Sequence, residues 1–147
     1  MPSLRPFVLT FAPLMVIAVA ATAMLVAGVP NSVVANETSR PVLVGGEADL
    51  DACGGAARVK ALAKGVTATV HAAPHATAPR RDTLTQGQQV ALCMFVEAGA
   101  RRWHGIVYSK DANVDCGVGT PIAKRQPYAG KCSTGWVEEK HLTDFAG

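Results

Sequence analysis

The chain has few aromatic residues and a small net charge. Aromatic residues make up only 5% of its 147 residues, and the net charge is only +3. Basic residues come in short pairs, Arg80-Arg81 and Arg101-Arg102, with no basic stripe interleaved with aromatics. A nucleic-acid partner is therefore not expected. Internal repeats and heptads are absent as well, and the helix content should be very low.

Residues 1–35 differ sharply from the rest of the chain. Residues 7–28 carry no charge, Arg5 precedes them, and Val33-Val34-Ala35 has the small residues of a signal peptidase site. We interpret residues 1–35 as a signal peptide cleaved after Ala35. Because about 20 apolar residues suffice to cross a bilayer, the alternative is a retained N-terminal membrane anchor. Both place the remainder outside the cytoplasm, in the periplasm or the extracellular space, free or anchored to the inner membrane.

The remainder divides into a short linker and one small domain. Residues 36–51 are polar and irregular, with Pro41 and Gly45-Gly46, which predicts a flexible linker. Residues 52–147 are enough for a single domain with a modest core. We expect it to be a monomer.

The cysteines lack the spacing of a metal site. Zinc ligands usually include pairs about two to four residues apart, whereas Cys53, Cys93, Cys116 and Cys132 are far apart. A cysteine nucleophile needs a nearby base, and no segment resembles a peptidase motif. We therefore expect no metal, no cofactor, no catalytic residue and no enzymatic activity. An even number of cysteines in an exported domain favours two disulfides.

Residues 84–108 predict a β-hairpin. The alternation in its first half is typical of a strand buried on one face. A turn-length break covers residues 97–100, and residues 103–108 resume as a second strand. The apolar residues of one parity are Val90, Leu92, Met94 and Val96, with Cys93 and Phe95 on the other.

Shorter signals surround the hairpin. Residues 66–71 alternate cleanly, residues 58–62 fit a short edge strand, residues 135–137 fit another strand, and residues 138–141 fit one helical turn. Residues 109–134 show no periodicity. A structureless loop of this length needs an explanation, and a Cys116–Cys132 bridge would supply one.

In order, the segments VTATVHAAP, LTQGQQVALC, RRWHGIVYS and GWVEEKHL resemble the bacterial SH3 (SH3b) domain. The family pattern is a strand with a V-R-x-x-P turn, then L-x-x-G-x-x-V, a W-x-x-V strand, G-W-V and a closing apolar residue. One departure is His71-Ala72-Ala73-Pro74, where the family has Arg-Ser-Gly-Pro, so a ligand contact by that arginine cannot be carried over. The residues at the pattern's places are Val70, Pro74, Leu84, Gly87, Val90, Trp103, Val107, Gly135, Trp136, Val137 and Leu142.

Four further motifs resemble a subgroup of small exported single-domain SH3b proteins with four cysteines, from Gram-negative bacteria. Together they span residues 51–147. The resemblance implies an all-β fold: a small, partly open barrel of five to six strands with a long disulfide-clamped loop. It also implies a binding or targeting role and no catalysis. The motifs are Ala52-Cys53-Gly54, Ala91-Leu92-Cys93, CGVGTP from Cys116 and RQPYAGKCSTGWV from Arg125.

Four cysteines allow three pairings. We favour Cys53–Cys93 with Cys116–Cys132. Cys93 has the parity opposite to Val90, which places it on the outer face of its strand. The segment around Cys53 precedes the first long strand and is free to cross that face.

The functional hypothesis is an SH3b-type binding module for a peptide or peptidoglycan element of the cell envelope. The alternative is a small secreted inhibitor or stability factor that acts on an envelope enzyme through the Cys116–Cys132 loop. Core packing is the competing role for the two tryptophans, and a simple surface role for the two histidines. The candidate ligand-binding residues are His71, His75, Trp103, Tyr128 and Trp136.

Overall fold

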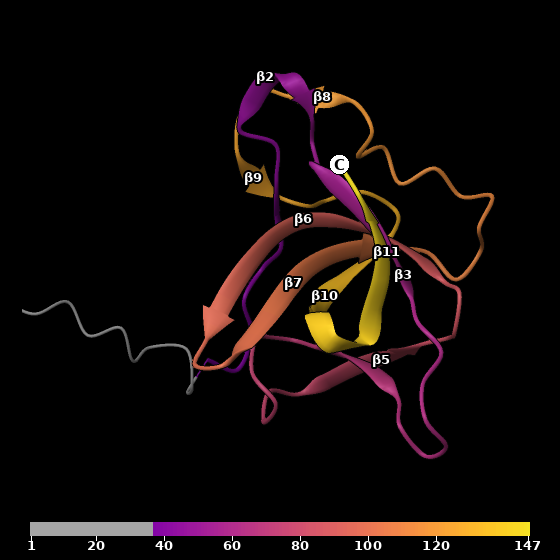
Figure 1. Ribbon diagram of the computed structural model, residues 1–147. Helices are drawn as coiled ribbons and strands as arrows, with labels where there is room; N and C mark the ends of the chain where they lie inside the picture. The colour runs from indigo at the N-terminus through magenta and orange to yellow at the C-terminus, as the bar shows by residue number, and fades with distance from the viewer. Residues whose placement is uncertain (1–36) are drawn as a thin grey trace, which may run out of the picture.

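The structure is a computed structural model that describes residues 37–147 and shows an all-β protein (Figure 1). The predicted leader, residues 1–35, lies outside the described residues. Within residues 37–147, no helix is long and apolar enough to span a membrane. The one helical element in that part is η2 (Glu139–His141), a 3₁₀ turn at the place where a single helical turn was predicted.

The centre of the fold is a seven-stranded antiparallel sheet. Its edge strands are β11 and β5, which do not pair with each other, so the sheet is open and does not close into a barrel. Both edge strands lie in segments that the sequence analysis did not identify as strands. In spatial order the strands are β11 (Leu142–Ala146), β3 (Gly55–Val59), β6 (Gln89–Ala98), β7 (Arg101–Tyr108), β10 (Ser133–Glu138), β4 (Ala68–His71) and β5 (Arg80–Leu84).

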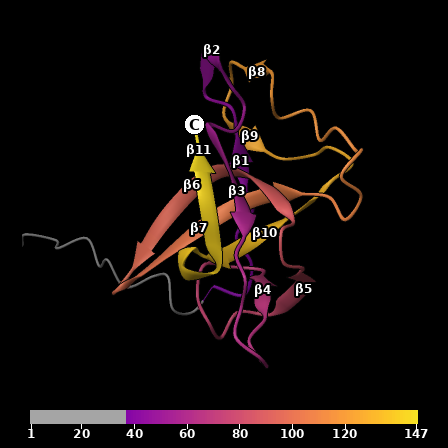
Figure 2. The same cartoon turned by 45° about the vertical axis from the view of Figure 1, so that its right-hand side comes forward.

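Two short ladders lie beside this sheet. β1 (Leu43–Val44) pairs with β9 (Gln126–Pro127), and β2 (Glu47–Asp51) pairs with β8 (Pro121–Ile122). Figures 1 and 2 both show β2, β8 and β9 together at one end of the molecule. The two ladders therefore tie the N-terminal segment to the long loop that follows β7.

The predicted β6–β7 hairpin is present, but its register shifts once. Leu92 pairs with Ile106 and Met94 pairs with Gly105, so Cys93 is an extra residue on β6. Such a bulge reverses the alternation of side chains along a strand. Val90 and Leu92 accordingly belong to one hydrophobic cluster, while Met94 packs against another. The prediction of a single face from Val90 to Val96 was wrong beyond Cys93.

The two clusters lie on opposite faces of the central strands. Neighbouring side chains of a strand point to opposite faces; Ile106 and Val137 belong to the first cluster, whereas Val107 and Trp136 belong to the second. The face that the sequence analysis treated as the outer one is therefore a second core.

The segment predicted as a flexible linker covers this second core. Val42 and Val44 are each only 2% exposed, and the Gly45 amide donates to the Ala52 carbonyl over 2.7 Å. Residues 37–51 therefore contact the domain through packing and strand pairing. Their order comes from pairing with β8 and β9, which lie more than seventy residues further along the chain.

Candidate functional site

The cysteines form two disulfides, Cys53–Cys93 and Cys116–Cys132. These are the pairs that the sequence analysis favoured. The first fixes the start of β3 onto the bulge of β6, and the second closes the long loop. Residues 37–147 contain no free cysteine, and no group of three His, Cys, Asp or Glu side chains in that range is placed to hold a metal ion.

Both tryptophans lie in the second core. Trp103 is 2% exposed and Trp136 is fully buried. The Trp136 Nε1–H donates to the Arg40 carbonyl over 2.9 Å, and the His71 ring meets Trp103 edge-on at 5.3 Å between ring centroids. Neither indole is open to a ligand in this structure.

The two histidines are engaged by the chain itself. His71 is buried, and its Nδ1 lies 3.0 Å from the Ala78 carbonyl oxygen. The His75 Nε2 lies 2.6 Å from the Glu37 carbonyl oxygen, and its Nδ1 lies 3.0 Å from the Thr77 hydroxyl. His75 thus fastens the first described residue to the loop after β4.

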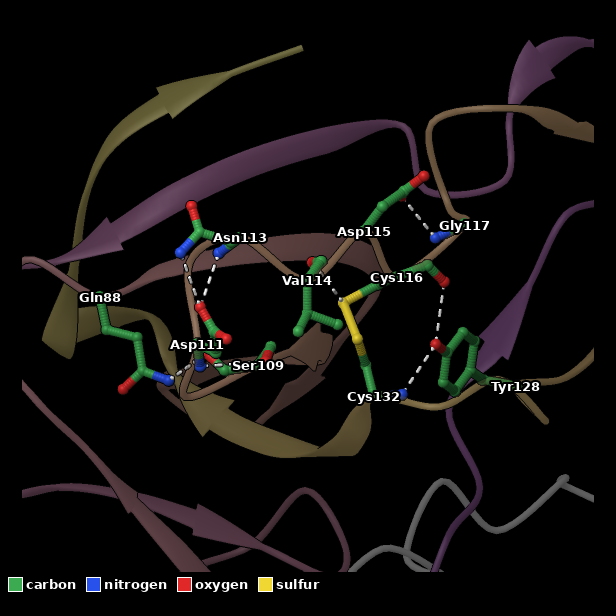
Figure 3. Close-up of a disulfide and its surroundings, with 10 residues drawn as sticks. All are labelled: Gln88, Ser109, Asp111, Asn113, Val114, Asp115, Cys116, Gly117, Tyr128 and Cys132. Atoms are coloured by element: carbon green, nitrogen blue, oxygen red, sulfur yellow. Dashed lines mark hydrogen bonds between the residues drawn. A yellow bond between two sulfur atoms is a disulfide. The ribbon is translucent and has the colours of Figure 1, made fainter.

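Tyr128 holds the clamped loop together (Figure 3). Its hydroxyl donates to the Cys116 carbonyl over 2.9 Å and accepts from the Cys132 amide over 3.2 Å. The phenol therefore bridges the two backbone segments that the disulfide also joins. This position is structural, and the ring is only partly exposed.

A groove opens beside the clamped loop, between the turn that precedes β6 and the chain that follows β7. Its cavity volume is about 530 Å³. Ala91, Val107 and Val118 supply apolar lining. Side-chain amides, hydroxyls, carboxylates and the cations of Arg58 and Lys110 also line it. We call it the polar groove; its polar lining includes Gln86, Gln88, Gln89, Ser109, Asp111 and Asp115.

One wall of the polar groove is the turn before β6. Gly87 has a φ of +78°, a left-handed conformation that glycine adopts most readily. The Gln88 Oε1 accepts from the Thr85 amide over 3.0 Å, and its Nε2 donates to the Ser109 carbonyl over 3.0 Å. Gln88 therefore braces the turn and also ties it to the opposite wall.

The opposite wall is held by short-range hydrogen bonds from aspartates (Figure 3). The Asp111 Oδ1 accepts from the Asn113 amide over 2.9 Å, and the Asp115 Oδ1 accepts from the Gly117 amide over 2.8 Å. Such Asx turns fix a loop without a ladder. With the disulfide at Cys116, they make the wall preorganised.

Charged and polar groups beside the groove are paired with one another. The Lys110 ammonium lies 2.9 Å from the Asp82 carboxylate and lowers the pKa of Asp82. Burial and the neighbouring Asp82 carboxylate raise the pKa of Tyr108 to about 12, and its hydroxyl donates to Asp82 over 3.2 Å. A phenol with that pKa stays neutral near pH 7, where a general acid or base would need a pKa closer to the working pH.

A second surface is an aromatic patch around His104, which was not predicted from the sequence. Phe95 and Phe145 are 61% and 51% exposed, and their ring centroids lie 6.5 and 5.8 Å from that of His104. The His104 Nε2 lies 2.7 Å from the Glu139 carboxylate. The sequence signal was Phe95, a large apolar residue on the parity opposite to Val90.

Of the five predicted ligand-binding residues, the structure brings none to the polar groove. His75, Tyr128 and Trp136 instead converge on residues 37–44, through hydrogen bonds to Glu37, Val42 and Arg40. The residues of the polar groove were not predicted to form one site, although the clamped loop that forms its outer wall was expected to take part in binding.

No protein-family model matches the chain, and neither does any curated protein or solved structure.

Proposed function

We propose that the chain is an exported SH3b-type binding module that recognises a peptide or peptidoglycan element of the cell envelope through the polar groove. The observation that carries this proposal is an open cavity of about 530 Å³ whose walls are held by hydrogen bonds and by a disulfide. A preorganised groove loses little conformational entropy on binding, which favours affinity.

The SH3b assignment is supported by the order of the elements that carry the sequence pattern. The W-x-x-V segment lies on β7 and the G-W-V segment on β10, and these strands pair along six residues from Ser133 to Glu138. The glycine of L-x-x-G-x-x-V has the positive φ that its turn requires. A 3₁₀ turn then leads to the closing Leu142.

The ligand chemistry follows from the groove's lining. Side-chain amides of Gln86 and Gln89 can both donate and accept, which suits the amides of a peptide and the hydroxyls of a sugar. The apolar lining from Ala91 and Val107 suits small aliphatic groups between those polar atoms. A peptide stem or a glycan with alternating polar and aliphatic groups therefore fits this site.

Export is part of the proposal. Two disulfides and no free cysteine within residues 37–147 fit an oxidising compartment, because thiols are kept reduced in the cytosol. The domain would then meet its ligand in the periplasm or at the cell surface.

The test is retention on purified peptidoglycan, with variants of the groove. The double variant Gln86→Ala/Gln89→Ala removes two exposed amides that line the groove. We expect it to reduce retention about tenfold or more, since two hydrogen bonds to a ligand are lost. The matched control is Gln126→Ala, an exposed glutamine on β9 away from the groove, and its retention should equal that of the unaltered chain.

Two outcomes would contradict the proposal. In the first, the double variant is retained as well as Gln126→Ala. In the second, the unaltered chain does not bind peptidoglycan and instead captures one envelope enzyme and lowers its activity, as the inhibitor alternative requires.

A further inference from the structure

Residues 37–44 form an extended strap across the face that carries the two tryptophans. The strap runs along one side of the molecule, from the start of the described chain towards β2 (Figure 1). Its residues are Glu37, Thr38, Ser39, Arg40, Pro41, Val42, Leu43 and Val44. The cleft beneath it is bounded by the loop after β4, the middle of β10 and the clamped loop, through contacts to Ala72, Trp136 and Tyr128.

The strap makes the backbone contacts of a bound peptide. Its Arg40 amide donates to the Ala72 carbonyl over 2.8 Å, and the Arg40 carbonyl accepts from the Trp136 indole. Two residues on, the Val42 carbonyl accepts from the Tyr128 amide over 3.0 Å. Main-chain hydrogen bonds with side-chain pockets at alternate positions are the usual mode by which proteins bind extended peptides.

The side chains at alternate positions fill the pockets of this cleft. Val42 and Val44 are buried and pack in the second core with Trp103, Val107 and Trp136. The Arg40 guanidinium lies 5.8 Å from the centroid of the Trp136 ring, a cation–π contact. Recognition thus involves one basic residue and two aliphatic residues, at alternate positions of the strap.

The strap is separable from the rest of the fold. It adds no strand to the seven-stranded sheet, and no disulfide holds it, because the first cysteine bridge begins at Cys53. The exposed turn at Gly46 and the fully exposed strand β2 connect it to that bridge. Both disulfides and all seven strands of the central sheet therefore lie outside the strap.

We propose that this cleft is a peptide-binding site and that the strap is its intramolecular ligand. The site takes an extended peptide with the pattern basic residue, any residue, aliphatic residue, any residue, aliphatic residue. A peptide of this pattern competes with the strap, and the strap keeps the site closed until a competitor displaces it. This site is distinct from the polar groove and does not depend on the function proposed for it.

The test separates the strap from the domain after folding. A protease recognition sequence is inserted between Asp49 and Leu50, which are exposed and lie between the two paired residues of β2. The purified, disulfide-bonded full chain is cleaved there, and the N-terminal fragment is left without a covalent link. A fluorescent peptide with the sequence of residues 37–46 is then added, and exchange is followed by fluorescence anisotropy and by mass spectrometry.

We expect the labelled peptide to replace the fragment and to bind saturably, while near-ultraviolet circular dichroism stays native. The same peptide with Val42→Asp and Val44→Asp should bind at least about tenfold more weakly, because two buried valines are lost. The uncleaved chain with the same insertion is the matched control. It should bind the labelled peptide at least about tenfold more weakly, because the tethered strap competes at high effective concentration.

Three results would overturn the proposal. In the first, the fragment does not exchange under native conditions. In the second, the fragment leaves and the domain unfolds, which would make the strap a structural element only. In the third, the fragment leaves a folded domain that binds neither peptide, or binds both equally.

Discussion

Tyr108 is the residue whose ionisation the fold controls most strongly. It is 3% exposed, and burial together with the Asp82 carboxylate raises its pKa from 10.0 to about 12. The folded state therefore keeps the phenol protonated at a pH where the unfolded chain loses the proton. The stabilisation that follows is complete below the unfolded pKa of 10.0 and is lost as pH rises from there to about 12.

The variant Tyr108→Phe measures how much the buried phenol contributes to the pH dependence of the unfolding free energy. Between about pH 8 and about pH 11, the unaltered protein should lose about 1.4 kcal/mol more unfolding free energy than Tyr108→Phe, the equivalent of one pKa unit. The measurement is urea denaturation of both proteins at each pH. Lysines titrate in both proteins alike, so only the difference counts. Equal losses in the two proteins would show that Tyr108 ionises as freely in the folded state as in the unfolded state.

Cys93 and Met94 show what could and what could not be predicted about the faces of β6 from its sequence. The parity of β6 correctly placed Cys93 on the face opposite to Val90, and that placement led to the pairing with Cys53. The same parity failed for Met94, because the bulge at Cys93 reverses the alternation. A bulge depends on how a strand pairs with its partner, so the sequence of one strand alone does not show where the bulge lies.

At the scale of elements, the clamped loop is the part whose order depends most on a covalent link. Cys116 and Cys132 are separated by 16 residues, and closing such a loop in the unfolded chain stabilises the native state by about 3 kcal/mol in the chain-entropy account. We expect Cys116→Ser/Cys132→Ser to lower the unfolding free energy by roughly that amount. It should also weaken retention on peptidoglycan more than tenfold, because one wall of the polar groove loses its preorganisation.

The matched variant is Cys53→Ser/Cys93→Ser, whose disulfide lies outside the clamped loop and whose cysteines do not line the polar groove. Its loop spans 40 residues, so its cost in stability should be at least as large. Its effect on retention should be small at temperatures where it remains folded. If both double variants lose stability and retention in parallel, the clamped loop has no special role in binding.

Elements with strong local periodicity were predicted correctly, and elements made by distant pairing were not. The β6–β7 hairpin and β10 follow from their alternation and aromatic content. β1 and β2 are short and lie in a polar segment that gives no strand signal. They are ordered by β9 and β8, so their existence depends on contacts that no local window contains.

At the scale of the whole molecule, the protein consists of a central sheet and a covering layer. The covering layer is made of the strap, which contains β1, of β2, and of the clamped loop, which contains β8 and β9. This layer encloses the second core. This arrangement explains why the predicted tryptophan site was found closed. Trp136 and Tyr128 both donate hydrogen bonds to the strap, and the sequence could not show that residues 37–44 contact them.

We expect the covering layer to open independently of the central sheet. The central strands β6, β7 and β10 have ladders on both sides, whereas β2 is fully exposed and pairs with β8 through only two residue pairs. Local opening of β2 and β8 breaks few hydrogen bonds and little buried contact, so its free energy lies well below that of global unfolding.

Hydrogen exchange followed by mass spectrometry tests this separation. Amides of β2 and β8 should exchange at least about a hundredfold faster than those of β7, with the strap between these limits because Val42 and Val44 are buried. Saturating the cleaved chain with the peptide of residues 37–46 should slow exchange at the Tyr128 amide, which donates to the Val42 carbonyl, and leave β7 unchanged. Uniform protection across β2, β7 and the strap would mean that the protein opens only as one cooperative unit, and the strap could then not be displaced without unfolding the domain.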